Sequence, residues 1–288
     1  MGNRVLAFLI LVFSMNIVTS SFLQAKETAL SEGVQKFYES GIERERLKKG
    51  TGRLEKLRTE KLLEQFLPQP PATILDVGGG TGIYTFDLAK RGYAVYLIDP
   101  VAYHIEEAKK IGKTVTGKAP LGYLLGDARK IEMSDQSADV VLFFGPLYHL
   151  NHADREVALS EAYRVLKSGG TLFAVAVSRY APINSYLKKG KMTPDLETAI
   201  FGSLTNGQFE YRDAVFYSHY PAELKKELEQ TGFNEVSLHG VEGLGSPVTD
   251  ENIVDEAVFQ DFVRIINASE QDESVLGMSS HIMAIGKK

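Results

Sequence analysis

A glycine-rich bend at residues 74–85, ILDVGGGTGIYT, has the residue types and spacing that could do chemistry. Asp76 ends an apolar run, and Gly78, Gly80 and Gly82 follow it at alternate positions. Glycine permits positive φ and leaves backbone N–H groups accessible, because no Cβ stands between them and a ligand. The helix expected after Gly82 presents its N-terminus, which favours an anionic group. The bend therefore predicts a ligand that approaches the backbone closely.

The glycine spacing separates the classes of ligand. It reads Asp-x-Gly-x-Gly-x-Gly, whereas the third glycine of the dinucleotide fingerprint Gly-x-Gly-x-x-Gly would fall at Ile83. No Lys-Ser or Lys-Thr pair follows the bend, which excludes a phosphate-binding P-loop. A tight strand-to-helix turn without a ligand is the alternative interpretation of the bend alone.

The ends of three further apolar runs carry residues that suit one common ligand. Asp99 closes the second run, where a carboxylate can accept both hydroxyls of a ribose. Asp127 and Ala128 close the third run and are placed to bind the edge of an adenine ring, and bulky residues at 143–150 close the fourth. Ligands of open parallel sheets bind at the carboxyl ends of the strands. The pattern therefore predicts a ligand that contains a nucleoside.

These ends belong to an alternation of strands and helices. The expected strands are 72–77, 93–99, 121–128, 138–145, 171–178, 234–240 and 280–288. The expected helices are 83–92, 102–112, 154–167, 221–233 and 250–268. Apolar strands that alternate with helices indicate an α/β fold in which helices cover both faces of a parallel sheet.

Two regions interrupt the alternation. Residues 26–70 form an expected N-terminal helical extension with a break at 49–52, and prolines end it. Residues 179–220 are rich in aromatic side chains and are expected to form a lid-like insertion, with plain core packing as the alternative. Residues 71–288 are therefore expected to form one domain that contains this insertion.

Residues 1–25 have the layout of a secretory signal peptide, with an apolar run from Val5 to Phe13 and small residues near Ala25. The run is too short to span a bilayer. Translation from Met15 is the alternative. The first interpretation predicts export or membrane anchoring, and the second predicts a cytoplasmic protein.

The overall composition limits the partners. A formal net charge of −5 and a pI near 5.8 argue against a nucleic-acid partner. The absence of cysteine excludes disulfides, Cys-ligated zinc, iron–sulfur clusters and a thiol nucleophile. No cluster of His, Asp and Glu shows metal-ligand spacing in the sequence, so no metal is expected.

The chain resembles the class I S-adenosylmethionine-dependent methyltransferases from about Tyr38 to Phe233, and more weakly to its C-terminal strand. ILDVGGGTGIYTFDLAKRGYAVYLID is similar to the first motif of that family and the acid after it. GDARKI, ADVVLFFGPLYHL and EAYRVLKSGGTLFAVAVSRY are similar to its later motifs, and YSHYPAELKKELEQTGF is similar to the segment before strand six in bacterial small-molecule members. The resemblance implies a Rossmann-like, doubly wound sheet of seven strands, mostly parallel with an antiparallel last strand, and S-adenosylmethionine as cofactor.

The resemblance also implies the cofactor-binding residues. They are Asp76, Gly78, Gly79, Gly80, Gly82, Asp99, Asp127, Ala128, Phe144 and Gly145. Asp76 and the backbone at Gly78 and Gly80 would face the methionyl part, and Asp99 would bind the ribose. Asp127 and Ala128 would hold the adenine, and Phe144 and Gly145 would flank the methionyl amine. Tyr38 and Arg44 would cover the cofactor from the N-terminal helix, with a solvated helix as the alternative.

Catalysis of methyl transfer requires an aligned acceptor, exclusion of water and in some reactions a proton acceptor. His149 and Tyr148 follow the fourth strand and are the first candidates, with a role as pocket wall as the alternative. His219 in the insertion is the third candidate, with a surface histidine as the alternative.

The sequence therefore predicts transfer of a methyl group to an O, N or C atom of a small molecule by direct in-line displacement. A non-catalytic protein that binds S-adenosylmethionine is one alternative, and a genuine signal peptide would favour it. A nucleotide-dependent oxidoreductase is the other alternative, and the glycine spacing argues against it.

Overall fold

The computed structural model describes residue 47 and residues 50–212, 214–245 and 255–288. The signal peptide, the start at Met15, and the roles of Tyr38 and Arg44 lie outside these residues. Helix α4 runs over Gly50–Phe66, so a helix begins inside the break expected at 49–52. Within the described residues, no helix combines the length and the apolar character that a membrane crossing requires.

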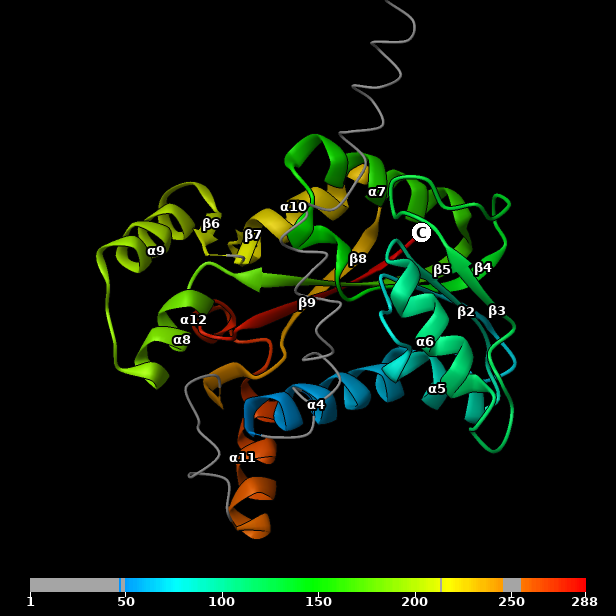
Figure 1. Cartoon of the computed structure of the whole chain (residues 1–288), viewed down its shortest axis with the longest axis horizontal. Helices are drawn as coiled ribbons and strands as arrows, with labels where there is room; N and C mark the ends of the chain where they lie inside the picture. The colour runs from blue at the N-terminus through cyan, green and yellow to red at the C-terminus, as the bar shows by residue number, and fades with distance from the viewer. Residues whose placement is uncertain (1–46, 48–49, 213, 246–254) are drawn as a thin grey trace, which may run out of the picture.

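The core of the fold is a sheet of parallel strands, as the sequence predicted (Figure 1). Its parallel strands are β1 (Thr73–Val77), β2 (Ala94–Asp99), β3 (Gly122–Leu125), β4 (Ala138–Phe143) and β5 (Leu166–Ser178). They lie in the order β3-β2-β1-β4-β5. The order reverses between β1 and β4, and such a switch point opens a crevice at the carboxyl ends of the strands. The glycine-rich bend follows β1 and lies at this crevice.

The antiparallel last strand is also confirmed. Strand β9 (His281–Lys287) runs antiparallel to β5 on one side and to β8 (Asn234–Gly240) on the other. Because β9 is antiparallel, its first residue lies at the edge where the parallel strands end. His281 accordingly pairs in register with Val177 near the end of β5.

Helices cover both faces of the sheet. On one face, α7 (His152–Val165) and α10 (Pro221–Thr231) pack apolar side chains against β4 and β5. On the other face, α4 and α5 (Ile83–Lys90) share a cluster with β1 and β4, and α6 (Ala102–Gly112) packs beside β2. The hydrophobic effect stabilises these layers by about 1.5–3 kcal/mol for each fully buried Leu, Ile or Phe.

The insertion has regular structure of its own. It contains α8 (Ala181–Lys189), α9 (Pro194–Asn206), β6 (Gln208–Tyr211) and β7 (Ala214–His219). The β6–β7 hairpin joins the central sheet, because Ser218 and His219 pair in parallel with Val177 and Ser178. Within the described part of the chain, the sheet therefore has nine strands, the seven expected ones and the two of this hairpin.

Several strands and helices begin or end at other residues than the sequence predicted. Strands β3 and β4 end at Leu125 and Phe143, so Asp127 and Gly145 lie in the loops that follow rather than in the strands. The helix expected at 250–268 is observed as α11 (Glu256–Ser269), which packs on α4. The short elements η1 (Pro146–His149), η2 (Gly243–Gly245) and α12 (Glu273–Leu276) complete the described chain.

Candidate functional site

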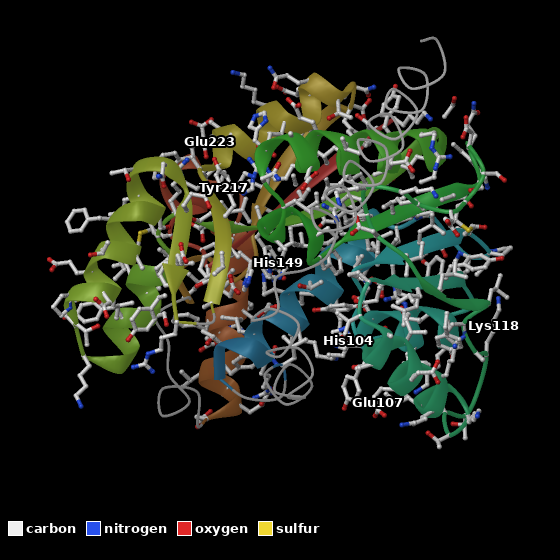
Figure 2. All side chains as sticks on the ribbon, turned by 45° about the horizontal axis from the view of Figure 1, so that its top comes forward. His104, Glu107, Lys118, His149, Tyr217 and Glu223 are labelled. Carbon is white, nitrogen blue, oxygen red and sulfur yellow. The ribbon has the colours of Figure 1, made fainter. Side chains whose placement is uncertain are left out.

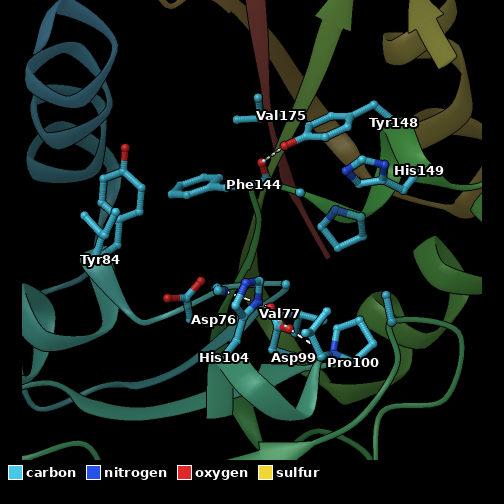
Figure 3. A pocket seen from close by; sticks show the side chains of 18 of the residues that line it. Asp76, Val77, Tyr84, Asp99, Pro100, His104, Phe144, Tyr148, His149 and Val175 are labelled. Carbon is cyan, nitrogen blue, oxygen red and sulfur yellow. Dashed lines mark hydrogen bonds and ion pairs between the residues drawn. The ribbon is translucent and has the colours of Figure 1, made fainter. Parts of the chain in front are cut away.

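A cavity lies over the carboxyl ends of β1, β2, β4 and β5 (Figure 3). The predicted cofactor residues that line it are Asp76, Gly78, Gly79, Gly80, Asp99, Asp127, Ala128, Phe144 and Gly145. Tyr148 and His149 line it as well. Gly82 does not line it and instead precedes the first turn of α5 in a left-handed conformation. The fold thus brings nearly all the predicted residues together.

The bend after β1 depends on glycine at two positions for two different reasons. Gly80 has φ +59°, and no atom lies within 4 Å of the position that a Cβ would take there, so its backbone faces open space. Gly79 has no such space, because a Cβ would lie 2.6 Å from Asp76 Cγ. The bend therefore leaves room for a ligand above Gly80 and holds Asp76 close beneath.

Asp76 is a buried carboxylate with capacity for a further hydrogen bond. Its Oδ2 accepts a hydrogen bond from Thr85 Oγ1 at 2.5 Å, while its Oδ1 has no hydrogen-bond partner among the described residues. Burial raises the pKa of Asp76 to about 6, and the negative charge of Asp99 also raises it. A cationic group in the cavity would therefore be stabilised beside Oδ1.

Asp99 holds the bend in place, a role that the sequence did not suggest. Its Oδ2 accepts a hydrogen bond from the Gly80 backbone N–H at 2.8 Å, and its Oδ1 accepts one from Val101 N–H at 2.9 Å. His104 of α6 places its Nδ1 3.0 Å from the same Oδ1. His104 is almost fully buried and lines the cavity. The contact with ribose stays a prediction, and the loop contacts are an additional role.

Asp127 is fixed by an arginine that the sequence reasoning missed. Arg129 donates from Nε to Oδ1 at 2.9 Å and from Nη2 to Oδ2 at 2.7 Å. Arg129 also donates to Asp154 at the start of α7. This bidentate pair orients the loop after β3. Binding of adenine by Asp127 and Ala128 stays a prediction.

The loop after β4 contributes an aromatic wall. The Tyr148 hydroxyl donates to the Phe144 carbonyl at 3.1 Å, and the Tyr84 and Phe144 rings meet edge to face at 5.2 Å (Figure 3). Burial lowers the pKa of His149 to about 4, despite the opposing effect of Asp99. His149 is therefore neutral at pH 7 and a weak proton acceptor. Its catalytic role, and that of Tyr148, stay predictions.

His219 does not line the cavity. It is fully buried at the end of β7, where its Nε2 lies 3.3 Å from Glu227 of α10. Burial lowers the pKa of His219, although the hydrogen bond to Glu227 and its charge act in the opposite direction. The His219 ring meets the ring of Tyr217 edge to face at 4.7 Å, and Figure 2 shows Tyr217 on the side of His149 that is away from His104. The structure thus gives His219 a position in the packing between β7 and α10.

None of the described residues of the insertion lines the cavity. Its aromatic side chains instead pack among themselves, with Phe209 and Phe216 stacked at 4.6 Å. This arrangement fits the core-packing alternative for residues 179–220, and the lid-like role stays a prediction.

Sequence reasoning missed the other end of the cavity. Glu55 and Thr59 of α4, Val175 of β5, and Val241 and His281 line that end. No spacing in the sequence relates α4 to β9, because tertiary packing alone brings them together. The only usable signal is the apolar stripe of α4, which predicts a buried face without naming the strand that it covers.

The charge of the cavity suits a cationic ligand. Among the residues that the structure describes, four carboxylates line it, those of Glu55, Asp76, Asp99 and Asp127. S-adenosylmethionine carries a positive sulfonium and an ammonium group, which such a cavity attracts. The pyrophosphate of a dinucleotide would be repelled by the same carboxylates. The lining therefore fits S-adenosylmethionine and disfavours the oxidoreductase alternative.

Comparisons with known proteins agree with this assignment. The sequence profile of a methyltransferase domain matches residues 75–174. A ubiquinone/menaquinone biosynthesis C-methyltransferase of a Ruegeria species is 33% identical over 125 residues, which cover 42% of this chain and 48% of that protein. A demethylmenaquinone methyltransferase of Protochlamydia amoebophila is 27% identical over 188 residues, covering 61% and 74%. The chain spans about half the length of the curated relatives it matches first.

Solved structures share the fold. A methyltransferase dependent on S-adenosylmethionine from Methanosarcina mazei superposes with a TM-score of 0.55 at 18% identity, covering 79% of this chain and 96% of its own. One from Thermotoga maritima, described as a possible histamine N-methyltransferase, superposes with a TM-score of 0.54 at 21% identity, covering 89% and 98%. Residues 75–174 therefore match a methyltransferase domain, and the fold of the chain is the one seen in these S-adenosylmethionine-dependent methyltransferases.

Proposed function

We propose that this chain transfers a methyl group from S-adenosylmethionine to a small-molecule acceptor by direct in-line displacement. The observation that supports this most strongly is the buried Asp76 carboxylate, which meets the cavity with one oxygen that lacks a hydrogen-bond partner among the described residues. The methionyl ammonium group of the cofactor would supply that partner. Asp99 and Asp127 would then lie toward the nucleoside.

The described residues would contribute mainly alignment and exclusion of water. When bound, S-adenosylmethionine supplies an activated methyl group on its sulfonium. The Gly80 backbone, held by Asp99, fixes the depth of the cavity, and Phe144 and Tyr148 form an apolar wall beside it. Holding two reactants in line can lower the barrier by about 7–11 kcal/mol. This lowering of the barrier by alignment requires no proton transfer by Phe144 or Tyr148.

The raised pKa of Asp76 predicts that the affinity for S-adenosylmethionine depends on pH. Its pKa of about 6 lies above the ordinary value of 3.8, and an adjacent ammonium would favour the ionised form. Cofactor binding should therefore release a proton from Asp76 below pH 6. We expect the affinity for S-adenosylmethionine to fall about tenfold from pH 7 to pH 5, and Asp76→Asn to bind more weakly with little pH dependence. Calorimetric titrations at pH 5, 6 and 7 measure both effects.

The exposed Asp135, which pairs with Arg164 outside the cavity, supplies the control. Asp135→Asn should keep the pH dependence of the wild type. Equal pH dependence in the wild type and in Asp76→Asn would show that Asp76 does not contact the cationic part of the cofactor.

Methyl transfer itself is tested with S-adenosylmethionine that carries a tritiated methyl group. We would offer the full-length chain demethylmenaquinol, catechol and histamine, and separate the products by chromatography. The first probe is suggested by the name of the Protochlamydia relative and the last by that of the Thermotoga structure. Label in one of these products, lost in Asp99→Ala, is the expected result. Tight cofactor binding without label in any product would favour the non-catalytic alternative.

A further inference from the structure

The end of the cavity over β5 and β9 contains a group of ionisable side chains that can exchange protons with a bound molecule. Glu55 of α4 and His281 of β9 line the cavity. Glu242, just after β8, lies behind His281 with only 2% of its side chain exposed. Each of these side chains contributes one nitrogen or carboxylate oxygen to a group of three atoms that lie within 4.8 Å of one another.

The surroundings of Glu242 stabilise its ionised form. Its Oε1 lies 2.5 Å from His281 Nδ1, and its Oε2 accepts hydrogen bonds from the His281 backbone N–H at 2.8 Å and from Ser279 Oγ at 3.0 Å. Burial by itself raises the pKa of Glu242, but attraction to His281 and these hydrogen bonds lower it below its ordinary value. Glu242 is therefore a carboxylate with a fixed orientation.

A carboxylate at Nδ1 determines how an imidazole exchanges protons. Nδ1 keeps its proton toward Glu242, so Nε2 is the ring nitrogen that gains and loses a proton. Glu55 adds a second carboxylate, with Oε2 3.8 Å from Nδ1. Two adjacent carboxylates stabilise the positive charge that the ring gains when Nε2 accepts a proton.

The position of His281 suits the acceptor rather than the cofactor. Under the proposed function, Asp99 and Asp127 bind the nucleoside over β2 and β3, and Asp76 binds the methionyl group over β1. The strand order then continues through β4 and β5 to β9. The end of the cavity at His281 is therefore the space that remains for the acceptor.

We propose that the Glu242–His281 pair, with Glu55 beside it, binds the methyl acceptor and accepts its proton. This inference rests on the proposed function. In the transfer step, the acceptor O–H or N–H gives its proton to His281 Nε2, and the acceptor forms the new bond to the methyl carbon. The electron pair of the broken S–C bond stays on sulfur. Carboxylates in this wall repel anions, so the acceptor is neutral or cationic.

Nuclear magnetic resonance of ¹⁵N-histidine in the full-length chain, loaded with S-adenosylhomocysteine, tests the pair without a known acceptor. We expect neutral His281 to carry its proton on Nδ1. We expect its pKa to fall by at least about one unit in Glu242→Gln, and by less in Glu55→Gln, which keeps the buried network intact. His281→Gln assigns the signal. A proton on Nε2, or a pKa unchanged in both variants, would overturn the proposal.

A binding experiment on the same complex tests the acceptor class. Catechol, a neutral O–H donor, and histamine, a cationic amine, are expected to shift the ring signals of His281. Benzoate, an anion, is expected to leave them in place. The exposed His152 beside Glu156 is the internal control and should respond to none of them. Failure of both catechol and histamine to move His281, or a shift caused by benzoate alone, would contradict the inference.

Where a probe is methylated, kinetics separate a proton acceptor from a structural residue. His281→Gln should lower kcat by about 100-fold or more and flatten its pH profile, while KM for S-adenosylmethionine changes little. A structural role would instead raise KM and leave the shape of the pH profile unchanged. Failure of S-adenosylhomocysteine to bind the wild type would overturn the proposed function itself, so the two failures are distinguishable.

Discussion

Asp99→Ala is expected to weaken binding of S-adenosylmethionine by about 100-fold or more, which corresponds to about 2.8 kcal/mol. The carboxylate accepts hydrogen bonds from the backbone N–H groups of Gly80 and Val101. His104 Nδ1 lies 3.0 Å from Oδ1, the oxygen that accepts from Val101. A buried donor that loses its acceptor costs about 1–3 kcal/mol. The substitution therefore loosens the bend above which the cofactor binds and also removes the predicted ribose contact.

Isothermal titration calorimetry measures this loss, and thermal melting checks that the variant folds. Asp99→Asn keeps the shape and an acceptor oxygen, so its affinity should fall between those of the wild type and the alanine variant. Asp87→Ala, on the exposed face of α5, is the matched control and should bind normally. An affinity unchanged in a folded Asp99→Ala protein would show that Asp99 neither holds the bend nor binds the ribose.

The largest expected change in stability follows from Glu227→Gln. Arg155 of α7 is almost fully buried and donates from Nε and Nη2 to the Glu227 carboxylate at 2.8–3.1 Å. Its guanidinium also lies 3.9 Å from the centre of the Tyr217 ring and donates to the Leu150 carbonyl. Removing one charge of such a pair leaves the other buried without compensation, which costs about 3–5 kcal/mol. Urea unfolding at pH 7 should show this loss.

The acid response should identify the same carboxylate. Burial opposes its charge, but His219 and Arg155 together lower the pKa of Glu227 to about 2 from 4.5. A lowered pKa contributes stability that is present above pH 4.5 and is lost as the pH falls toward 2. The difference between wild type and Glu227→Gln should therefore shrink by roughly 3 kcal/mol over that range. Glu229→Gln, two residues further along α10 and exposed, should change the free energy of unfolding by less than about 0.5 kcal/mol. A similar loss in both variants would contradict this account of the pair.

The parallel strands were predictable because they are buried on both faces. Such strands appear in the sequence as continuous apolar runs, and β1, β2 and β4 begin within one residue of their predicted starts. The cofactor side of the site was predictable for a related reason. Asp76, Asp99 and Asp127 lie in or just after three of these runs, so locating the strands also located the acids.

The insertion and the acceptor side were not predictable in this way. Strand β7 joins the sheet through only two register pairs with β5, a long-range contact that leaves no periodicity in the sequence. That contact also directs His219 toward Glu227 instead of the cavity. Glu55 and His281 are separated by more than two hundred residues and meet only because α4 packs over β9. Tertiary packing, rather than local pattern, therefore brings together the end of the cavity that we propose binds the acceptor.

Calorimetry of the full chain shows most directly whether the cavity over β1, β2, β4 and β5 binds S-adenosylmethionine. S-adenosylmethionine, S-adenosylhomocysteine and NADH would be titrated separately at pH 7. We expect saturable one-to-one binding of the first two ligands and no measurable binding of NADH. Binding of NADH together with no response to S-adenosylmethionine would contradict this expectation.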